Sequence, residues 1–292
     1  MIDKNMHVNK LPDFIIVGGS KCGTTSLHDY LSQHPQLYIC PQKETFFFIN
    51  EPNRSNHKRW GAITELEDYQ GLFKDAPENS VIGEISTTYY SCPESARLIH
   101  EMLPNVKIIA ILRDPANRAF SDYQMHVRDG NEEPDLKGLI SPHNQHVKRG
   151  FYYSELLPFF EKFDRKQIKI LLFEDLCKDP VIFLQDLFRF VGVDDSFVPN
   201  MSKKGREGGL PKNQAVNQLL TRKNPVRSFA AGVLKIFLPV ETRRKIREGL
   251  VKKNIEKVKL SSEERKQLIE IYRSDILQLE KLIEKDLSAW LK

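Results

Sequence analysis

Short apolar runs recur along the first two hundred residues of the chain, and each is bounded by turn residues. They are Phe14–Gly18, Leu37–Cys40, Val81–Ser86, Lys107–Leu112 and Gln167–Phe173. Continuous apolar runs of this length, rich in β-branched and aromatic residues, are typical of strands buried on both faces. The pattern therefore predicts strands that lie inside a sheet.

The segments between these strands carry apolar residues at helical spacing. They predict helices at Thr24–Gln33, Pro93–Leu103, Pro115–Asp129, Ser154–Phe163 and Pro180–Val191. Proline opens three of them, at positions where its missing N–H has no partner to lose, and glycine closes two. Strands that alternate with helices indicate βαβ units, and hence an α/β fold with a mainly parallel sheet flanked by helices.

The pattern changes after about residue 200. Residues 202–213 are rich in Gly, Lys and Pro and read as a loop, and residues 214–292 read as helical, ending in a helix over Glu263–Trp290. We see no internal repeat and no clear domain boundary. We therefore expect a single domain over 1–292, with an α/β nucleotide-binding core at 12–200 and a basic, helical C-terminal extension at 201–292.

Composition narrows the class of protein. Hydrophobic residues make up 40% of the chain, enough for a large core, yet no apolar run reaches the roughly 18 residues of a membrane-spanning helix. Residues 1–10 are polar, unlike a secretory signal. The four cysteines, Cys22, Cys40, Cys92 and Cys177, lack metal-binding or disulfide spacing. A reducing, cytoplasmic setting with no metal site is the simplest expectation.

The net charge of +5 is unevenly distributed. Residues 201–260 hold 16 Lys and Arg against 4 Asp and Glu, so the rest of the chain is net negative. This region is either a set of solvated helix faces or a surface for an anionic partner, such as an acidic glycan, phospholipid headgroups or nucleic acid. The apolar stretch 228–240 inside it is too short to span a bilayer. It either packs on the domain or lies at a membrane surface.

The strongest chemical signal follows the first strand. Gly18-Gly19-Ser20-Lys21-Cys22-Gly23-Thr24-Thr25-Ser26 is a glycine-rich turn that leads into a helix. Such a turn presents backbone N–H groups and the positive end of a helix dipole to a phosphate. Gly18 and Gly23 have the spacing of a nucleotide-triphosphate loop, but Thr24 stands where its lysine should follow. The lysine of this loop, Lys21, lies inside it, which favours a different phosphate donor.

A second anion site is expected where the fourth strand ends. Arg113 closes that apolar strand, and Ser121 lies two turns into the next helix, within Leu-Arg-Asp-Pro-Ala-Asn-Arg-Ala-Phe-Ser-Asp-Tyr. A guanidinium and a hydroxyl together suit a phosphate. The segment alone is a weak signal, because Arg-Asp-Pro often only begins a helix.

These two motifs together resemble those of sulfotransferases that use 3′-phosphoadenosine 5′-phosphosulfate (PAPS), and the resemblance extends from residue 12 to about 210. The chain is most similar to bacterial sulfotransferases akin to the heparan sulfate, or glycan, branch. The resemblance implies that the first loop, with Lys21, Cys22, Gly23, Thr24, Thr25 and Ser26, holds the 5′-phosphosulfate. It also implies that Arg113 and Ser121 hold the 3′-phosphate, that the product is PAP, and that no metal takes part.

Further segments fit the resemblance. Pro41-Gln42-Lys43-Glu44 is similar to the Pro-x-Lys-Glu segment of glycan sulfotransferases, in which the glutamate is the general base, here Glu44. Otherwise, Lys43 and Glu44 are surface charges before an aromatic run. Lys204, Gly205 and Arg206 are similar to a loop that closes over the nucleotide, or else form a solvated basic loop. Tyr153 is expected to line the site, and His126 to face the acceptor, although a lone helical histidine is often structural.

One departure weakens any transfer of acceptor identity. The segment Gly83-Glu84-Ile85-Ser86-Thr87 is similar to a Glu-Lys-Ser-Pro segment of some animal enzymes, but Ile85 replaces the lysine. The resemblance thus implies sulfuryl transfer to a hydroxyl or amine of an acceptor, with a carbohydrate favoured and no nucleic acid expected. Two alternatives stay open: a P-loop kinase or NTPase, and a non-catalytic basic protein that binds glycans or membrane surfaces.

Overall fold

The computed structural model describes residues 10–50, 58, 61–202, 208–221 and 239–292, and these residues divide into two compact units. The first unit combines the described residues of 1–115, 151–205 and 273–291, and the second combines those of 116–150 and 206–272 with the last residue. The expectation that 1–292 folds as one domain stays a prediction.

The first unit contains a five-stranded parallel sheet. Its strands are β1 (Phe14–Gly18), β2 (Leu37–Ile39), β3 (Val81–Ile85), β4 (Lys107–Leu112) and β5 (Ile168–Leu172), in the spatial order β2-β3-β1-β4-β5. Each neighbouring pair is parallel, and β1 lies at the centre. Because parallel strands end at the same edge, the segments that follow β1 and β4 are brought together there.

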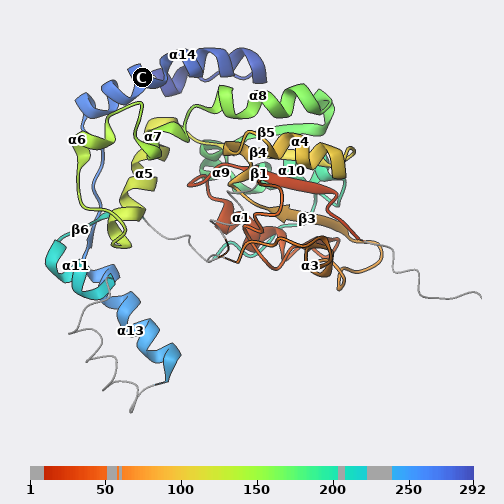
Figure 1. The fold of residues 1–292 in the computed structure, drawn as a ribbon, viewed down its shortest axis with the longest axis horizontal. Helices are drawn as coiled ribbons and strands as arrows, with labels where there is room; N and C mark the ends of the chain where they lie inside the picture. The colour runs from red at the N-terminus through yellow and green to blue at the C-terminus, as the bar shows by residue number, and fades with distance from the viewer. Residues whose placement is uncertain (1–9, 51–57, 59–60, 203–207, 222–238) are drawn as a thin grey trace, which may run out of the picture. The chain divides into compact units, whose positions relative to one another are not determined.

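Helices cover this sheet (Figure 1). Those of the first unit are α1 (Thr24–Leu31), α3 (Leu66–Gly71), α4 (Ser95–Met102), α8 (Tyr152–Lys162), α9 (Phe173–Lys178), α10 (Pro180–Val191) and the second half of α14 (Ser262–Ile283), with 3-10 turns η2 (Tyr89–Ser91), η3 (Arg165–Gln167) and η4 (Ser288–Leu291). The start of α10 shows why such helices form where they do. Asp179 caps it by accepting the N–H groups of Val181 and Ile182, and Gly192 ends it with φ 92°.

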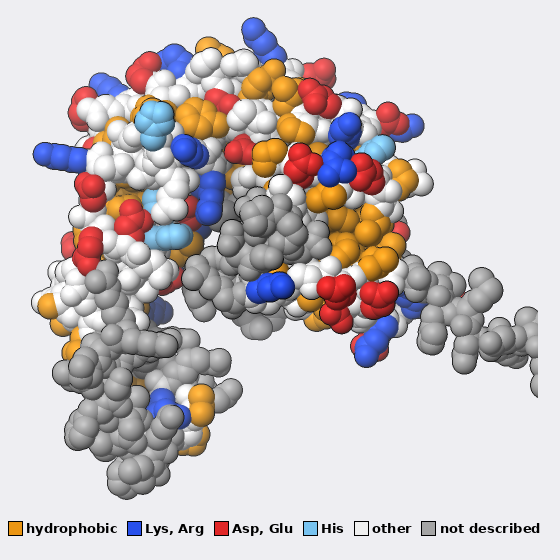
Figure 2. Space-filling view, in the orientation of Figure 1, with side chains coloured by type: hydrophobic (Ala, Val, Ile, Leu, Met, Phe, Trp, Pro, Cys, Tyr) orange, Lys and Arg blue, Asp and Glu red, His pale blue; other side chains and the backbone are white. Residues whose placement is uncertain are grey.

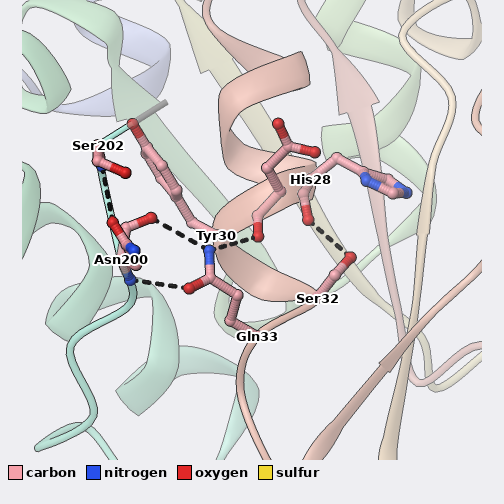
Figure 3. A pocket seen from close by; sticks show the side chains of 7 residues that line it. His28, Tyr30, Ser32, Gln33, Asn200 and Ser202 are labelled. Carbon is pink, nitrogen blue, oxygen red and sulfur yellow. Dashed lines mark hydrogen bonds between the residues drawn. The ribbon is translucent and has the colours of Figure 1, made fainter. Parts of the chain in front are cut away.

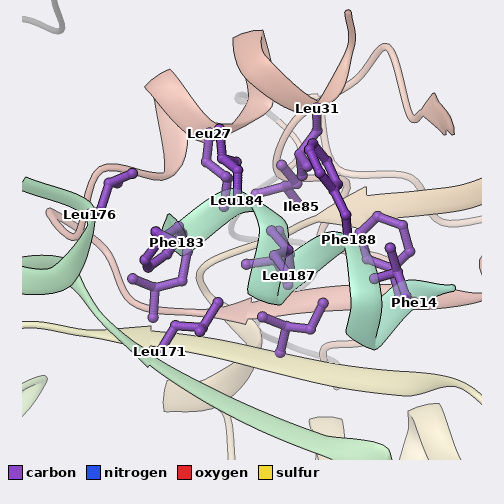
Figure 4. Packing of buried hydrophobic residues seen from close by; sticks show 14 of the residues in the cluster. Phe14, Leu27, Leu31, Ile85, Leu171, Leu176, Phe183, Leu184, Leu187 and Phe188 are labelled. Carbon is purple, nitrogen blue, oxygen red and sulfur yellow. The ribbon is translucent and has the colours of Figure 1, made fainter. Parts of the chain in front are cut away.

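Apolar side chains from α1, α9 and α10 meet those of the sheet in one cluster (Figure 4). Leu27 and Leu31 of α1 and Leu187 of α10 are fully buried in it. On β1, Phe14 packs so closely over Gly83 of β3 that a Cβ at Gly83 would overlap its ring. Helices α4 and α8 do not belong to this cluster and pack against each other. The ring centroids of His100 and Phe163 lie 5.2 Å apart there.

The second unit is mainly helical. Its elements are α5 (Pro115–Arg128), α6 (Leu136–Leu139), α7 (Gln145–Lys148), α11 (Gln214–Thr221), α13 (Val240–Lys253), the short antiparallel pair β6 (Leu210–Pro211) and β7 (Ile255–Glu256), and the first half of α14 (Ser262–Ile283). Tyr272 of α14 is fully buried, and its hydroxyl donates to the carbonyl of Val147 at 2.8 Å. A Cβ at Gly150 would collide with this tyrosine ring at 2.7–2.8 Å.

The predicted α/β class is confirmed, and the five predicted strands are those of the sheet, within a residue or two. Two expectations are wrong in detail. The last helix does not continue to Trp290 but ends at Ile283, because Glu284 adopts a left-handed φ of 54°. The region predicted as loop and helix after residue 200 also contains the pair β6–β7, whose two-residue strands leave no periodic signal.

The described surface carries charges of both signs, and Figure 2 shows acidic and basic side chains interspersed over its visible face. Within the described ranges, no helix is both long and apolar enough to cross a membrane.

Candidate active site

The glycine-rich loop connects β1 to α1 in the first unit. Gly19 donates its backbone N–H to the Ile111 carbonyl of β4 at 2.7 Å, which ties the loop to the neighbouring strand. Lys21 and Gly23 have φ values of 69° and 80°, in the left-handed region that reverses the chain. Since the residue that precedes α1 is Gly23, no side chain of its own caps the first-turn amides. The loop thus presents N–H groups to an anion.

Two of the glycines are required by close packing. A Cβ at Gly18 would lie 2.9 Å from the ring of Tyr90, and a Cβ at Gly23 would lie 2.9 Å from the ring of Phe173. Only glycine allows the loop backbone to approach these rings. The shape of the loop is therefore fixed by aromatic side chains from elsewhere in the first unit.

Lys43 brings a second ammonium group to this loop. Its Nζ donates to Thr24 Oγ1 at 3.2 Å and to Thr25 Oγ1 at 3.4 Å, and lies 3.9 Å from a carboxylate oxygen of Glu44. Burial lowers the pKa of Lys43 below its ordinary value, and the charge of Glu44 opposes that shift. An anion bound on the loop would further favour the charged ammonium.

The carboxylate of Glu44 is oriented by two hydroxyl groups that follow β3. Thr87 Oγ1 donates to it at 2.7 Å and Thr88 Oγ1 at 3.3 Å. The backbone N–H of Glu44 donates to the Ile85 carbonyl at 3.0 Å, and its φ is 60°. Glu44 thus lies beside Lys43 and at the end of β3, so its carboxylate is brought close to the glycine-rich loop.

Arg113 also contacts the loop. Its Nη1 donates to the Lys21 carbonyl at 3.1 Å, and its guanidinium lies 4.9 Å from the ring centroid of Phe173. The Arg113 carbonyl accepts from the hydroxyl of Tyr152, a fully buried residue of α8, at 2.9 Å. The cation expected at the end of β4 therefore contacts the glycine-rich loop directly.

Tyr153, which the sequence predicts to line the site, follows Tyr152 on α8. Its backbone N–H donates to a carboxylate oxygen of Asp275 on α14 at 3.1 Å, and its side chain is half-buried. Burial raises the pKa of Asp275 to about 6, although backbone N–H groups of residues 152–154 oppose the shift. Of the two tyrosines, Tyr152 is the one whose hydroxyl reaches the end of β4.

Ser121 and His126 belong to α5 in the second unit, where both are half-buried. The ring of His126 lies 4.8 Å from that of His146, centroid to centroid. Burial lowers the pKa of His126. The roles given to Ser121 and His126 stay predictions.

A buried charge cluster surrounds His146. Its Nδ1 lies 2.9 Å from Asp122 and its Nε2 lies 2.7 Å from Glu132. Arg118 and Arg149 each place an Nη1 3.8 Å from the Asp122 carboxylate. Although burial opposes both charges, these contacts raise the pKa of His146 and lower that of Asp122 to about 2.

Among the described residues, one group of side chains has the spacing of a metal site, and it lies in this cluster. Ligand atoms of Asp122, His126 and His146 lie within 4.8 Å of one another. Both His146 nitrogens already contact carboxylates, and two guanidinium groups lie against Asp122. This positive surrounding opposes a bound cation, so we interpret the cluster as a charge network within the second unit.

Some predicted site residues lie outside the described residues. These are Lys204, Gly205 and Arg206, together with 228–238 of the apolar stretch 228–240.

A pocket of about 380 Å³ lies at the far end of α1 from the glycine-rich loop (Figure 3). It is lined by His28, Asp29, Tyr30, Ser32 and Gln33 of that region and by Asn200 and Ser202. Gln33 and Asn200 exchange side-chain and backbone hydrogen bonds of 2.8 and 3.2 Å across it. These polar groups join the two segments that form the wall, and none belongs to the loop that is expected to bind phosphate.

Lys43 is the functional candidate that the sequence does not single out. Its neighbour Glu44 is predicted as the base, but nothing in the sequence shows that a lysine nineteen residues after Thr24 reaches the hydroxyl of that threonine. The contact depends on β2 and β1 ending at the same edge of the sheet. Arg113, in contrast, is predicted as an anion ligand from its place at the end of a strand.

Comparison with known proteins gives a consistent result. The family model described as "sulfotransferase domain" matches residues 11–285. A bacterial sulfotransferase from Alicyclobacillus acidocaldarius has a similar structure, with a TM-score of 0.72 and 27% identity, over 97% of this chain and 100% of that one. A sulfotransferase domain from a Synechococcus olefin synthase, 16% identical with a TM-score of 0.50, shares the fold.

Curated relatives are larger proteins. The human bifunctional heparan sulfate N-deacetylase/N-sulfotransferase 3 is 29% identical over 209 residues, 65% of this chain and 23% of that protein. The mouse heparan sulfate glucosamine 3-O-sulfotransferase 3A1 is 28% identical over 208 residues, 66% of this chain and 50% of that protein. The matched part of the chain thus spans about a quarter to a half of these relatives.

Proposed function

The chain belongs to the sulfotransferase domain family, a family of enzymes, and on that premise we propose that it transfers a sulfuryl group from PAPS to a hydroxyl or amine of a carbohydrate. The donor, the acceptor and the residue roles given below are parts of this proposal.

One observation carries it: the ammonium of Lys43 lies between the loop hydroxyls of Thr24 and Thr25 and the carboxylate of Glu44. A phosphate-binding loop alone would suit many ligands. A carboxylate held beside that loop, with a partly buried cation between them, suits transfer from a bound anionic donor to an acceptor whose proton must be removed.

The residues present fit PAPS. The backbone N–H groups of the loop and the hydroxyls of Thr24, Thr25 and Ser26 suit its 5′-phosphosulfate, with Lys21 and Lys43 to balance charge. Arg113 and Ser121 are proposed to hold the 3′-phosphate, which ATP lacks. Cys22 is fully buried within the loop and contributes through its backbone. PAPS supplies the activated sulfuryl group.

The chemistry resembles phosphoryl transfer, which is largely a matter of positioning and charge stabilisation. Glu44 takes the proton of the acceptor hydroxyl or amine as a bond forms between the acceptor atom and sulfur. The bond between sulfur and the bridging oxygen breaks, and Lys21 stabilises the negative charge that remains on the 5′-phosphate of PAP. Thr87 and Thr88 hold the carboxylate of Glu44 in one orientation during the step.

A carbohydrate acceptor is proposed because the curated relatives named above are sulfotransferases of heparan sulfate. The basic balance of residues 201–260 suits an acidic glycan, since positive clusters attract anionic polymers. Lys204, Gly205 and Arg206 belong to this region and are proposed to contact the nucleotide.

Lys21→Ala and Glu44→Gln test the two central roles. Each substitution is expected to lower turnover about 100- to 1,000-fold, because each removes one group that acts in the transition state. Turnover is measured with radiolabelled PAPS under saturating donor, and circular dichroism checks the fold. Near-normal turnover in either variant would refute the role assigned to that residue.

A further inference from the structure

A carboxylate that the proposed chemistry does not use lies one residue before Ile85, whose carbonyl accepts the Glu44 N–H. This carboxylate, Glu84 of β3, is fully buried, and no ion pair is formed by it among the described residues. Instead it accepts four hydroxyl hydrogen bonds, from Thr45 at 2.6 Å, Ser86 at 2.7 Å, Tyr89 at 2.8 Å and Tyr69 at 2.5 Å. Burying a carboxylate without a cation is costly, and these hydrogen bonds offset part of that cost.

Three of these hydroxyls each accept a hydrogen bond from a backbone N–H of the segment after Glu44. Thr45 N–H donates to Ser86 Oγ at 3.0 Å, Phe47 N–H to Thr45 Oγ1 at 3.3 Å, and Phe48 N–H to the Tyr89 hydroxyl at 3.4 Å. The three hydroxyl oxygens all lie 2.6–2.8 Å from Oε1 of Glu84, and those of Thr45 and Tyr89 also hydrogen-bond to each other at 2.7 Å. One carboxylate oxygen is therefore the common end of three connections to the backbone of residues 45–48.

This segment has a backbone that needs support. Glu44 and Phe46 have φ values of 60° and 57°, and such left-handed conformations are unfavourable by about 1 kcal/mol or more for residues other than glycine. They persist only where surrounding contacts determine them. Thr45, between them, is completely buried and bonds to Glu84 through its side chain.

We propose that Glu84 is a positioning residue that holds the strained segment 44–48 and so aims the Glu44 carboxylate at the acceptor. The inference rests on the proposed function, in which Glu44 is the base. Glu84 touches neither donor nor acceptor. Its effect passes through Thr45, Ser86 and Tyr89 to the backbone next to Glu44.

Two tyrosines provide a matched pair of variants. Tyr89 and Tyr69 both donate to Glu84, but Tyr89 also accepts the N–H of Phe48, whereas Tyr69 donates to the other carboxylate oxygen, Oε2. The ring of Tyr69 stacks on Phe47 at 4.1 Å, and Tyr69→Phe keeps that ring. Tyr89→Phe removes one connection to the segment, and Tyr69→Phe removes none.

With saturating PAPS, Tyr89→Phe is expected to lower kcat about tenfold or more, whereas Tyr69→Phe stays within about twofold of the wild type. The dissociation constant for PAP is expected to change in neither variant, because the donor binds on the loop after β1. A purely structural role would destabilise both variants alike in urea and would not separate their kcat values. Equal kcat in the two variants overturns the proposal.

Thr45 gives a second test that does not depend on aromatic packing. Thr45→Val removes the hydroxyl at nearly constant shape and is expected to lower kcat, and Thr45→Ser, which keeps the hydroxyl, is expected to restore most of it. If Thr45→Val and Thr45→Ser have equal kcat, the proposal fails.

Glu44→Gln is measured beside these variants to separate the two claims. If Glu44→Gln retains turnover, the base is misassigned and the proposed function fails at that point. If Glu44→Gln is inactive while Tyr89→Phe and Tyr69→Phe have the same kcat, Glu44 remains the base and the role of Glu84 is overturned.

Discussion

At the scale of single residues, the site combines groups that the sequence predicts with groups that it does not. Lys21, Thr24 and Arg113 stand in motifs whose local spacing is enough to indicate phosphate binding. Lys43 and Glu84 lie in segments that resemble family motifs, but local spacing gives neither of them a contact. Their contacts join residues 19 and 39 positions apart, from Lys43 to Thr24 and from Thr45 to Glu84. Local pattern shows which strand ends hold polar residues, but not which of them touch.

Lys43 is expected to take part in turnover through its position on the loop. Lys43→Met removes the ammonium from Thr24 and Thr25 and is expected to lower kcat/KM about 100-fold, since a partly buried cation at an anion site is lost. Lys43→Arg keeps the positive charge, and its kcat/KM is expected to fall by less. Steady-state kinetics with PAPS measures both.

Lys162 is exposed in the last turn of α8, so Lys162→Met is the control for loss of one positive charge. If Lys43→Met and Lys162→Met have the same kcat/KM, the role of Lys43 is wrong.

At the scale of elements, helix boundaries are predictable where one residue decides them and not where distant segments do. Asp179, Pro180 and Gly192 define α10 locally. The first turn of α8 instead depends on Asp275, more than one hundred residues later, which accepts the Tyr153 N–H. Helix α5, from Pro115 to Arg128, is again within one residue of the range predicted from local signals.

Asp275→Asn is expected to raise the free energy of unfolding near neutral pH by about 2 kcal/mol, because the pKa of the buried carboxyl is raised to about 6. Between its ordinary value of 3.8 and about 6, the folded state binds more protons than the unfolded one. Stability therefore falls as pH rises through this window, and the asparagine variant loses that slope. Urea unfolding across the window measures it.

The control is Asp286→Asn. Asp286 also accepts a backbone N–H, from Ser288 at 2.8 Å, but is exposed. The Asp286→Asn variant is expected to keep the wild-type dependence of stability on pH. An unchanged slope in Asp275→Asn would contradict the assignment.

The charge network on α5 has a pH dependence of its own. Hydrogen bonds to Asp122 and Glu132 outweigh the effect of burial and raise the pKa of His146. The protonated imidazole therefore stabilises the folded state, and this contribution is complete below the ordinary pKa of histidine. The stabilisation is lost as pH rises through the raised value. His146→Gln is expected to lower the free energy of unfolding by about 3 kcal/mol at mildly acidic pH and by less at alkaline pH.

Urea midpoints measured from about pH 6 to about pH 9 test this difference. His143→Gln, at an exposed histidine three residues earlier, is the control. A pH-independent effect of His146→Gln would contradict the raised pKa of His146, because it would mean that this pKa is the same in the folded and unfolded states.

At the scale of the whole molecule, the pattern of apolar runs predicts a parallel sheet with helices around it, but it cannot give the order β2-β3-β1-β4-β5. That order places β3 beside β1, and so brings Glu44, Thr87 and Thr88 close to the glycine-rich loop. The strand order is set by contacts between distant residues, such as the packing of Phe14 over Gly83, and such contacts cannot be seen in the local sequence. The acceptor is likewise not encoded in any local motif.

The most direct test of the central claim is a transfer assay that offers the protein two labelled donors, PAPS without metal and ATP with magnesium. The acceptors are oligosaccharides, phenols and lipids. We predict transfer of labelled sulfate from PAPS to an oligosaccharide, with no requirement for magnesium and no transfer from ATP. The account would be contradicted if the protein transferred phosphate from ATP and transferred no sulfate from PAPS to any acceptor.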